Sequence, residues 1–130
     1  MWNRYRHPLG RLPLLDGASD AVVQQLASLM TSTQVRAGEV LVRQGGHNRQ
    51  FLLVEEGNLN VERDGVHIAR LGRGDFVGEI SLLGDGIATA TVTAKTDVVL
   101  YVSSTTEFYE LLHSVVGDTI THTAAERAAV

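Results

Sequence analysis

The chain has 130 residues, of which 44% are hydrophobic, and this size and composition suit one globular domain with a real core. The formal net charge of −4 argues against a general nucleic-acid surface, which requires a clustered basic excess. The chain contains no cysteine, so thiolate catalysis, disulfides and thiol redox chemistry are excluded.

The first eleven residues are basic and contain Arg4, Arg6, His7 and Arg11. They lack the continuous apolar core of a signal peptide, and no run in the chain is long enough to span a membrane. We therefore interpret residues 1–11 as a solvated lead-in or linker and residues 12–130 as the folded domain. We expect a cytoplasmic protein whose domain contacts neither a membrane nor nucleic acid.

The first predicted element is an amphipathic helix over residues 20–30. Its apolar side chains recur at helical spacing, at Val22, Val23, Leu26, Leu29 and Met30. Ser19 precedes the helix and is a suitable N-cap residue.

Glycine turns then separate several short runs that have the alternating or continuously apolar pattern of β-strands. These runs cover residues 40–43, 51–54, 58–62, 66–71, 90–94 and 98–102. Asp64-Gly65 separates two of them and supplies the positive φ angles that a tight hairpin needs. Six to eight short strands, with helices only at the ends, predict a mainly β fold of the jelly-roll or β-roll sandwich class.

Two helices are predicted after the last strand. Ser104 and Glu107 have the spacing of a capping box, with Ser104 as the N-cap. The helix that follows has an apolar face made by Phe108, Leu111, Leu112, Val115 and Val116. Gly117-Asp118 breaks it, and residues 119–129 form a second, alanine-rich helix.

The most informative stretch is residues 76–94. It opens with an aromatic residue, a valine and then Gly78-Glu79, continues into one predicted helical turn at Ile80–Leu83, and ends in a β-branched strand. A glycine at the start of a short helix exposes backbone N–H groups, which together with the helix dipole form an anion site. Because Glu79 would lie beside that site and could accept a hydrogen bond from a sugar hydroxyl, the segment suits a small phosphorylated sugar.

This segment resembles the phosphate-binding cassette of cyclic-nucleotide-binding domains, the family of the cAMP receptor protein and the protein kinase A regulatory subunits. The first half of the family pattern is matched by residues 78–83, and the second half, at the same spacing, by Ala90, Thr91, Val92 and Ala94. Ile87 holds the family's proline position, and Ala88 holds the position of its phosphate-binding arginine. The likeness extends over about residues 12–128.

The resemblance implies the fold of that family and a cyclic-nucleotide ligand, with cAMP favoured over cGMP. It implies that the ligand-binding residues are Gly78, Glu79, Ile80, Ser81, Ala88, Thr89 and Ala90. In the family, the glutamate at position 79 binds the ribose hydroxyl, and backbone N–H groups at positions 80 and 81 face the cyclic phosphate. The residue at position 89 contacts the phosphate, and a threonine there is linked to cGMP tolerance.

Ala88 is the departure from the family pattern, because an alanine cannot make the charged contact of the family arginine. Losing one side of a buried charge-assisted pair costs about 2–5 kcal/mol, which is roughly thirty-fold to several-thousand-fold in affinity. Another cation could replace it, and Arg49, Arg70 and Arg73 are the nearest candidates by loop position. The sequence alone does not place any of them in the pocket.

Two functions therefore stay open. In the first, the domain senses a cyclic nucleotide, and its last helix covers the base through Ile120, Ala124 or Ala128 and signals to an attached effector. In the second, the fold is retained without tight ligand binding, and the domain is an interaction or autoinhibitory module. In both, the chain is part of a longer protein, for example a patatin-like lipid hydrolase, a transporter or a transcription regulator.

An enzyme within these residues is not expected. No serine lies in a Gly-x-Ser-x-Gly elbow, and Gly84-Asp85-Gly86 lacks the Lys-Ser/Thr of a nucleoside triphosphate loop. The five histidines include no His-x-His pair on a predicted strand, so no metal and no other cofactor is predicted.

Overall fold

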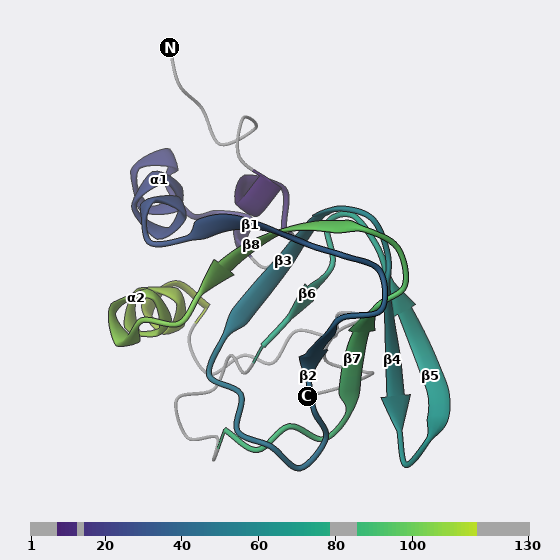
Figure 1. The fold of residues 1–130 in the computed structure, drawn as a ribbon. Coiled ribbons are helices and arrows are strands. Elements are labelled where there is room, and N and C mark those ends of the chain that lie inside the picture. The colour runs from purple at the N-terminus through teal and green to yellow at the C-terminus, as the bar shows by residue number, and fades with distance from the viewer. Residues whose placement is uncertain (1–7, 13–14, 79–85, 117–130) are drawn as a thin grey trace.

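Two four-stranded antiparallel sheets share one buried core in the computed structural model of the chain (Figure 1). The structure describes residues 8–12, 15–78 and 86–116. In the first sheet the strand order is β1 (Thr31–Val35), β8 (Val98–Ser103), β3 (Phe51–Glu56) and β6 (Phe76–Val77). In the second sheet it is β2 (Val40–Val42), β7 (Thr91–Ala94), β4 (Leu59–Arg63) and β5 (Val66–Leu71). The predicted mainly β sandwich is confirmed.

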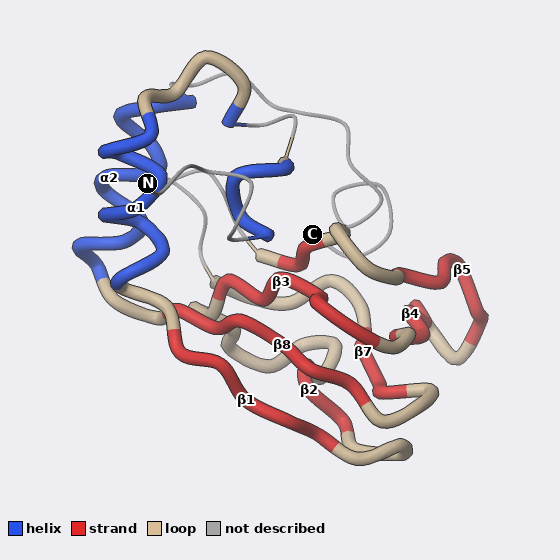
Figure 2. Tube along the Cα trace, turned by 90° about the horizontal axis from the view of Figure 1, so that it is seen from above, coloured by secondary structure: helices blue, strands red, loops and turns tan. Residues whose placement is uncertain are grey.

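Three helices lie outside the sheets: the 3-10 helix η2 (Pro8–Arg11), α1 (Asp20–Ser28) and α2 (Thr106–Val116). Figure 2 shows α1 and α2 side by side at one end of the first sheet. The Ser19 hydroxyl oxygen accepts from the Val22 N–H at 3.2 Å, so the predicted N-cap of α1 is confirmed. None of the described helices is long and apolar enough to cross a membrane.

The core forms because apolar side chains alternate along the strands and turn inward. In β7 and β8, Val92, Ala94, Val98 and Leu100 are buried, while the residues between them are partly exposed. Three buried aromatic rings join the first sheet to α2. The Phe51 ring stacks on Phe76 with centroids 5.1 Å apart, and the Phe108 ring of α2 lies 5.3 Å from Phe51.

Two strands of the first sheet were not predicted. β1 pairs with β8 along its whole length, but its residues 31–34 are polar and exposed, so no apolar alternation marks them in the sequence. β6 has only two residues and exists because it pairs with Leu52 and Leu53 of β3. Both strands are therefore made by their neighbours rather than by a local pattern.

The predicted lead-in is only partly described, and its described part is packed. Leu9, within η2, is completely buried against the core, and Leu12 is 4% exposed. The apolar contacts of the fold therefore begin before residue 12. The second predicted C-terminal helix, residues 119–129, and the predicted helical turn at residues 80–83 lie outside the described residues.

The predicted capping box of α2 is wrong in its register. The helix begins at Thr106, and the Thr105 hydroxyl oxygen accepts from the Phe108 N–H at 3.1 Å. Thr105 is therefore the N-cap, one residue after the predicted Ser104. The sequence contains four consecutive hydroxyl residues at positions 103–106, so the local pattern alone does not decide which of them is the cap.

This difference gives a direct stability prediction. Thr105→Ala should lower the free energy of unfolding by about 1 kcal/mol, because it removes the acceptor for an otherwise unpaired helix N–H. Ser104→Ala should change it by less than about 0.5 kcal/mol, since that residue is exposed. Urea denaturation of the two variants measures both values. A larger loss of unfolding free energy in Ser104→Ala than in Thr105→Ala would show that Ser104 is the N-cap.

Candidate functional site

The second half of the predicted cassette is held by a loop from elsewhere in the chain. The β2–β3 loop runs antiparallel to residues 86–88, with an isolated bridge between His47 and Ile87. The Gly45 N–H donates to the Ala88 carbonyl at 2.8 Å, and the Ala88 N–H donates to the Gly46 carbonyl at 2.8 Å. A third bond joins the Asn48 N–H to the Gly86 carbonyl at 2.6 Å. The main chain of residues 86–88 is thus fixed before β7 begins.

Side chains in this stretch alternate between the interior and solvent. Ala88 is 4% exposed and Ala90 is completely buried, whereas Ile87 is 40% exposed and Thr89 is exposed. Position 88, where the family places an arginine, therefore points toward the body of the domain. The side chain at position 89 points toward solvent.

Gly78, at the entrance of the cassette, is required by a close approach. A Cβ atom built on it would lie 3.1 Å from Cδ2 and 3.2 Å from Cα of Phe51, and 3.3 Å from the Gln50 carbonyl oxygen. Its φ angle is +157° and the residue is buried. A larger residue at this position would push the end of β6 away from β3.

One loop consequently contacts both ends of the cassette. Residues 45–48 pair with residues 86–88, and residues 50–51 pack against Gly78. Gln44 anchors the start of this loop: its N–H donates to the Thr91 hydroxyl at 3.0 Å, and its side-chain amide exchanges two hydrogen bonds with Asp64. The structure thus brings Gly78, Ala88, Thr89 and Ala90 onto one scaffold. Glu79, Ile80 and Ser81 lie outside the described residues.

The arginines named from the sequence have different surroundings. The Arg73 Nε lies 3.5 Å from a Glu55 carboxylate oxygen, so this cation already has an anionic partner. Arg70 is exposed on the edge strand β5, opposite Asn60 of β4. Arg49 is different, because its guanidinium lies directly against Gly86.

Sequence reasoning missed Arg63, which also contacts the cassette. The Arg63 Nε donates to the Thr89 carbonyl oxygen at 3.1 Å and so holds the main chain just before β7. Arg63 ends β4 and precedes the predicted hairpin turn, and no local pattern in the sequence indicates that this turn lies beside residue 89.

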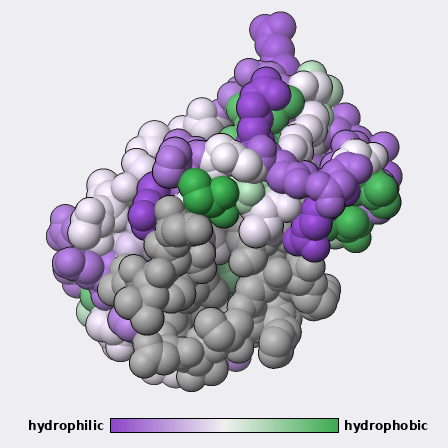
Figure 3. Space-filling model, turned by 90° about the horizontal axis from the view of Figure 1, so that it is seen from below, coloured by the Kyte–Doolittle hydropathy of each residue, from purple (hydrophilic) through white to green (hydrophobic). Residues whose placement is uncertain are grey.

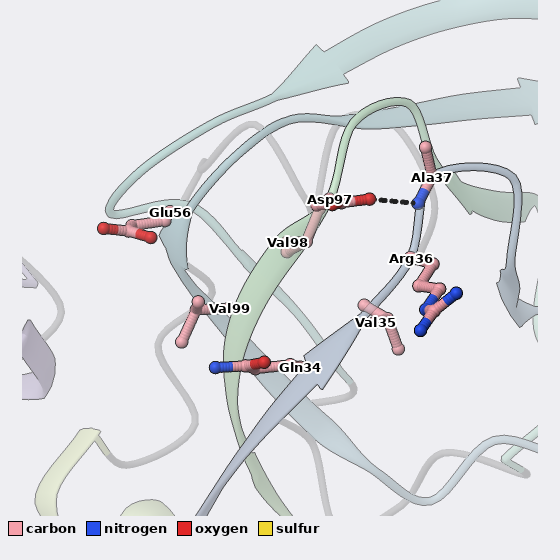
Figure 4. A pocket seen from close by; sticks show the side chains of 8 residues that line it. All are labelled: Gln34, Val35, Arg36, Ala37, Glu56, Asp97, Val98 and Val99. Carbon is pink, nitrogen blue, oxygen red and sulfur yellow. Dashed lines mark hydrogen bonds between the residues drawn. The ribbon is translucent and has the colours of Figure 1, made fainter.

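A separate hollow lies elsewhere among the described residues. It has a volume of about 780 Å³ and is lined by Gln34, Val35, Arg36, Ala37, Glu56, Asp97, Val98 and Val99 (Figure 4). These residues come from the end of β1 and the connection after it, from the last residue of β3, and from the β7–β8 connection with the start of β8. An Asp97 carboxylate oxygen accepts from the Ala37 N–H at 2.9 Å. The hollow shares no lining residue with the cassette, so it is not the predicted ligand site.

Comparison with known proteins identifies related chains. The family model described as cyclic nucleotide-binding domain matches residues 32–115. A cAMP-dependent protein kinase regulatory subunit from Schizosaccharomyces pombe is 31% identical over 109 residues, which cover 83% of this chain and 26% of that protein. The chain spans about a quarter of the length of the curated relatives that it matches first.

Solved structures have the same fold. The structure titled cAMP-bound PfPKA-R has a TM-score of 0.76 at 22% identity, over 87% of this chain and 41% of that one. The regulatory subunit of a cAMP-independent protein kinase A from Trypanosoma brucei has a TM-score of 0.72 at 29% identity, over 88% of this chain and 42% of that one.

Proposed function

The chain belongs to the cyclic nucleotide-binding domain family, and we propose that it is a cytoplasmic regulatory module that senses a cyclic nucleotide, cAMP in preference to cGMP. The ligand docks at the cassette, and its binding biases an effector attached to the C-terminal helices. The whole protein is longer than this chain, and the effector is covalently attached. The domain itself binds and switches and carries out no reaction.

The observation that carries this proposal is the retained backbone of the cassette. A Cβ atom at Gly78 would press on Phe51 and Gln50, and residues 86–88 are fixed by three hydrogen bonds to the β2–β3 loop. A main chain that is fixed in this way favours a preorganised binding site. The spacing of Gly78, Ala90 and Val92 is also that of the family pattern.

In the proposed complex, Glu79 accepts hydrogen bonds from the ribose. The N–H groups of Ile80 and Ser81 donate to the cyclic phosphate, and Thr89 and Ala90 border the phosphate from the other half of the cassette. Apolar side chains of the sandwich enclose the base. These roles follow the family pattern position by position.

The signal would reach the effector through α2. Phe108 packs on Phe51, and Phe51 contacts both Phe76 and the space next to Gly78. A movement of the main chain at Gly78 would therefore shift the Phe51 ring, which contacts Phe108 of α2. Ligand binding would shift a two-state equilibrium of the helices that follow β8.

A second function is favoured by one observation, the alanine at position 88. Without the family arginine, the domain could keep its fold and serve as an interaction or autoinhibitory module of a larger protein. Such divergence within this fold has support, because one structural neighbour is titled the regulatory subunit of a cAMP-independent kinase. This alternative predicts that cyclic nucleotides bind weakly or not at all.

Isothermal titration calorimetry of the chain with cAMP separates the two functions. We expect saturable binding with a dissociation constant below about 100 μM. Titration with cGMP under the same conditions should give a weaker constant, and 5′-AMP, which lacks the cyclic phosphate, serves as the matched control. A flat cAMP titration at millimolar ligand would reject the sensor and favour the interaction module.

A further inference from the structure

The space beside Gly86 is occupied by a guanidinium group. A Cβ atom built on Gly86 would lie 2.7 Å from Nε, 3.0 Å from Cζ and 3.3 Å from Nη2 of Arg49. Gly86 is itself buried and has a φ angle of +78°. The Arg49 head group therefore covers the main chain at the start of the second half of the cassette, where only a glycine leaves room for it.

This position is fixed rather than accidental. Arg49 directly follows Asn48, whose N–H donates to the Gly86 carbonyl at 2.6 Å. The Asn48 side chain also bonds to the main chain of Gln50, on the other side of Arg49. The backbone of Arg49 is thus clamped at both neighbours, which limits how far its side chain can swing from Gly86.

The guanidinium also lies close to the position of the missing family arginine. Gly86 and Ala88 are both buried, whereas Ile87 between them is 40% exposed. The Arg49 guanidinium therefore places a positive charge two residues along the chain from the position of the family arginine.

Within the described part of the chain, Arg49 forms no ion pair or hydrogen bond through its guanidinium. Its neighbours are used otherwise, because Arg63 bonds the Thr89 carbonyl and Arg73 pairs with Glu55. A guanidinium carries five N–H donors in a planar fork that matches the oxygens of a phosphate. Arg49 consequently has donors to offer to an anion near the cassette.

Other surface features of the described residues give weaker evidence for a ligand or a partner. The exposed large apolar side chains among the described residues are Val40, Val66, Ile68 and Ile87. On the face shown in Figure 3, the hydrophobic surface falls into separate patches with hydrophilic surface between them. The large hollow at the opposite end of the sandwich has no buried polar group without a partner that would indicate a ligand.

We propose that Arg49, on the β2–β3 loop, supplies the guanidinium that binds the cyclic phosphate in place of the arginine missing at position 88. The proposal rests on the cyclic-nucleotide function proposed above and names the residue that makes it possible. The anion is a phosphodiester with one negative charge. Arg49 donates charge-assisted hydrogen bonds to its exocyclic oxygens.

The test is calorimetric titration of cAMP into the wild type and three variants with matched size. Arg49→Gln should weaken cAMP binding about ten-fold or more, because it removes a hydrogen bond to a charged group. Arg49→Lys should retain part of the affinity, and Arg70→Gln, on an exposed edge strand, should leave it unchanged. The salt dependence of the dissociation constant should decrease in Arg49→Gln alone, since one screened charge pair is lost.

The single variant Ala88→Arg and the double variant of Ala88→Arg with Arg49→Gln complete a double-mutant cycle. In Arg49→Gln, adding Ala88→Arg should restore cAMP binding to wild-type strength or better, because the charge then comes from the family position. Melting temperatures of all variants should agree within a few degrees, which separates a binding effect from a folding effect.

The outcomes distinguish the two proposals. If the wild type binds cAMP and Arg49→Gln binds equally well with the same salt dependence, the role of Arg49 is rejected and the sensor function stands. If the wild type does not bind cAMP but Ala88→Arg does, both proposals are rejected. The cassette then keeps the family pattern but has lost the ability to bind the ligand.

Discussion

Ala88→Arg is expected to tighten cAMP binding about thirty-fold or more. The substitution restores a charge-assisted hydrogen bond to the cyclic phosphate, and such a bond in a desolvated site is worth at least about 2 kcal/mol. We expect the lower end of the range of about 2–5 kcal/mol for such a bond, since Arg49 already places a guanidinium beside Gly86. Calorimetric titration against the wild type measures the gain.

The geometry allows the longer side chain to act. Ala88 is 4% exposed, and its main chain is fixed on both sides by hydrogen bonds to Gly45 and Gly46. A side chain at this position therefore starts from a buried Cβ atom on a fixed main chain.

Ala88→Gln is the matched control, because it adds an uncharged side chain that can donate hydrogen bonds. It should recover only the contribution of a neutral hydrogen bond, about 0.5–1.5 kcal/mol. The gain in Ala88→Arg should also shrink with added salt, as expected for a charge pair. An arginine variant that folds normally and binds no better than wild type would mean that position 88 does not face the ligand.

Phe108→Ala should lower the free energy of unfolding by about 3–5 kcal/mol. The Phe108 ring is completely buried, lies 5.3 Å from Phe51 and meets Tyr109 edge-on at 5.7 Å. Removing it leaves a cavity where α2 meets the first sheet and deletes aromatic contacts that add to simple burial. Urea denaturation followed by circular dichroism measures the loss.

A domain of this size has a total stability of about 5–15 kcal/mol, so the alanine variant could be largely unfolded. Phe108→Leu keeps most of the apolar volume and should show a smaller loss. Glu110→Ala, on the exposed side of α2, should change stability by less than about 0.5 kcal/mol. Equal stabilities of Phe108→Leu and wild type would show that the ring contacts to Phe51 contribute nothing.

The same residue tests the proposed signalling route. If α2 reports ligand binding through Phe51 and Phe108, then Phe108→Leu should bind cAMP with near wild-type affinity but lose the ligand-induced change in the helices after β8. Hydrogen exchange of the α2 amides with and without cAMP compares the two proteins directly.

Much of the fold could be predicted because its signals are local. The Ser19 cap, the Asp64-Gly65 hairpin and the inward alternation of β7 depend only on residues within a few positions of each other. The strands β1 and β6 could not be predicted, because a polar exposed run and a two-residue strand are defined only by the partners they pair with. The N-cap of α2 lies one residue after the predicted one, since four hydroxyl residues stand in a row there and the local pattern does not select between them.

For the candidate site too, some features could be predicted from the sequence and others only from the tertiary structure. The sequence by itself determined where a cassette is predicted and that an alanine stands at its arginine position, because the pattern from Gly78 to Ala94 is contiguous and its spacing can be compared directly with a family. Only the tertiary structure decided which other cations lie beside it. Arg49 reaches Gly86, and Arg63 reaches the carbonyl of Thr89, across long stretches of chain. Those encounters depend on the hydrogen-bond register between loops, and a slip of a single residue would turn a different side chain toward the same place.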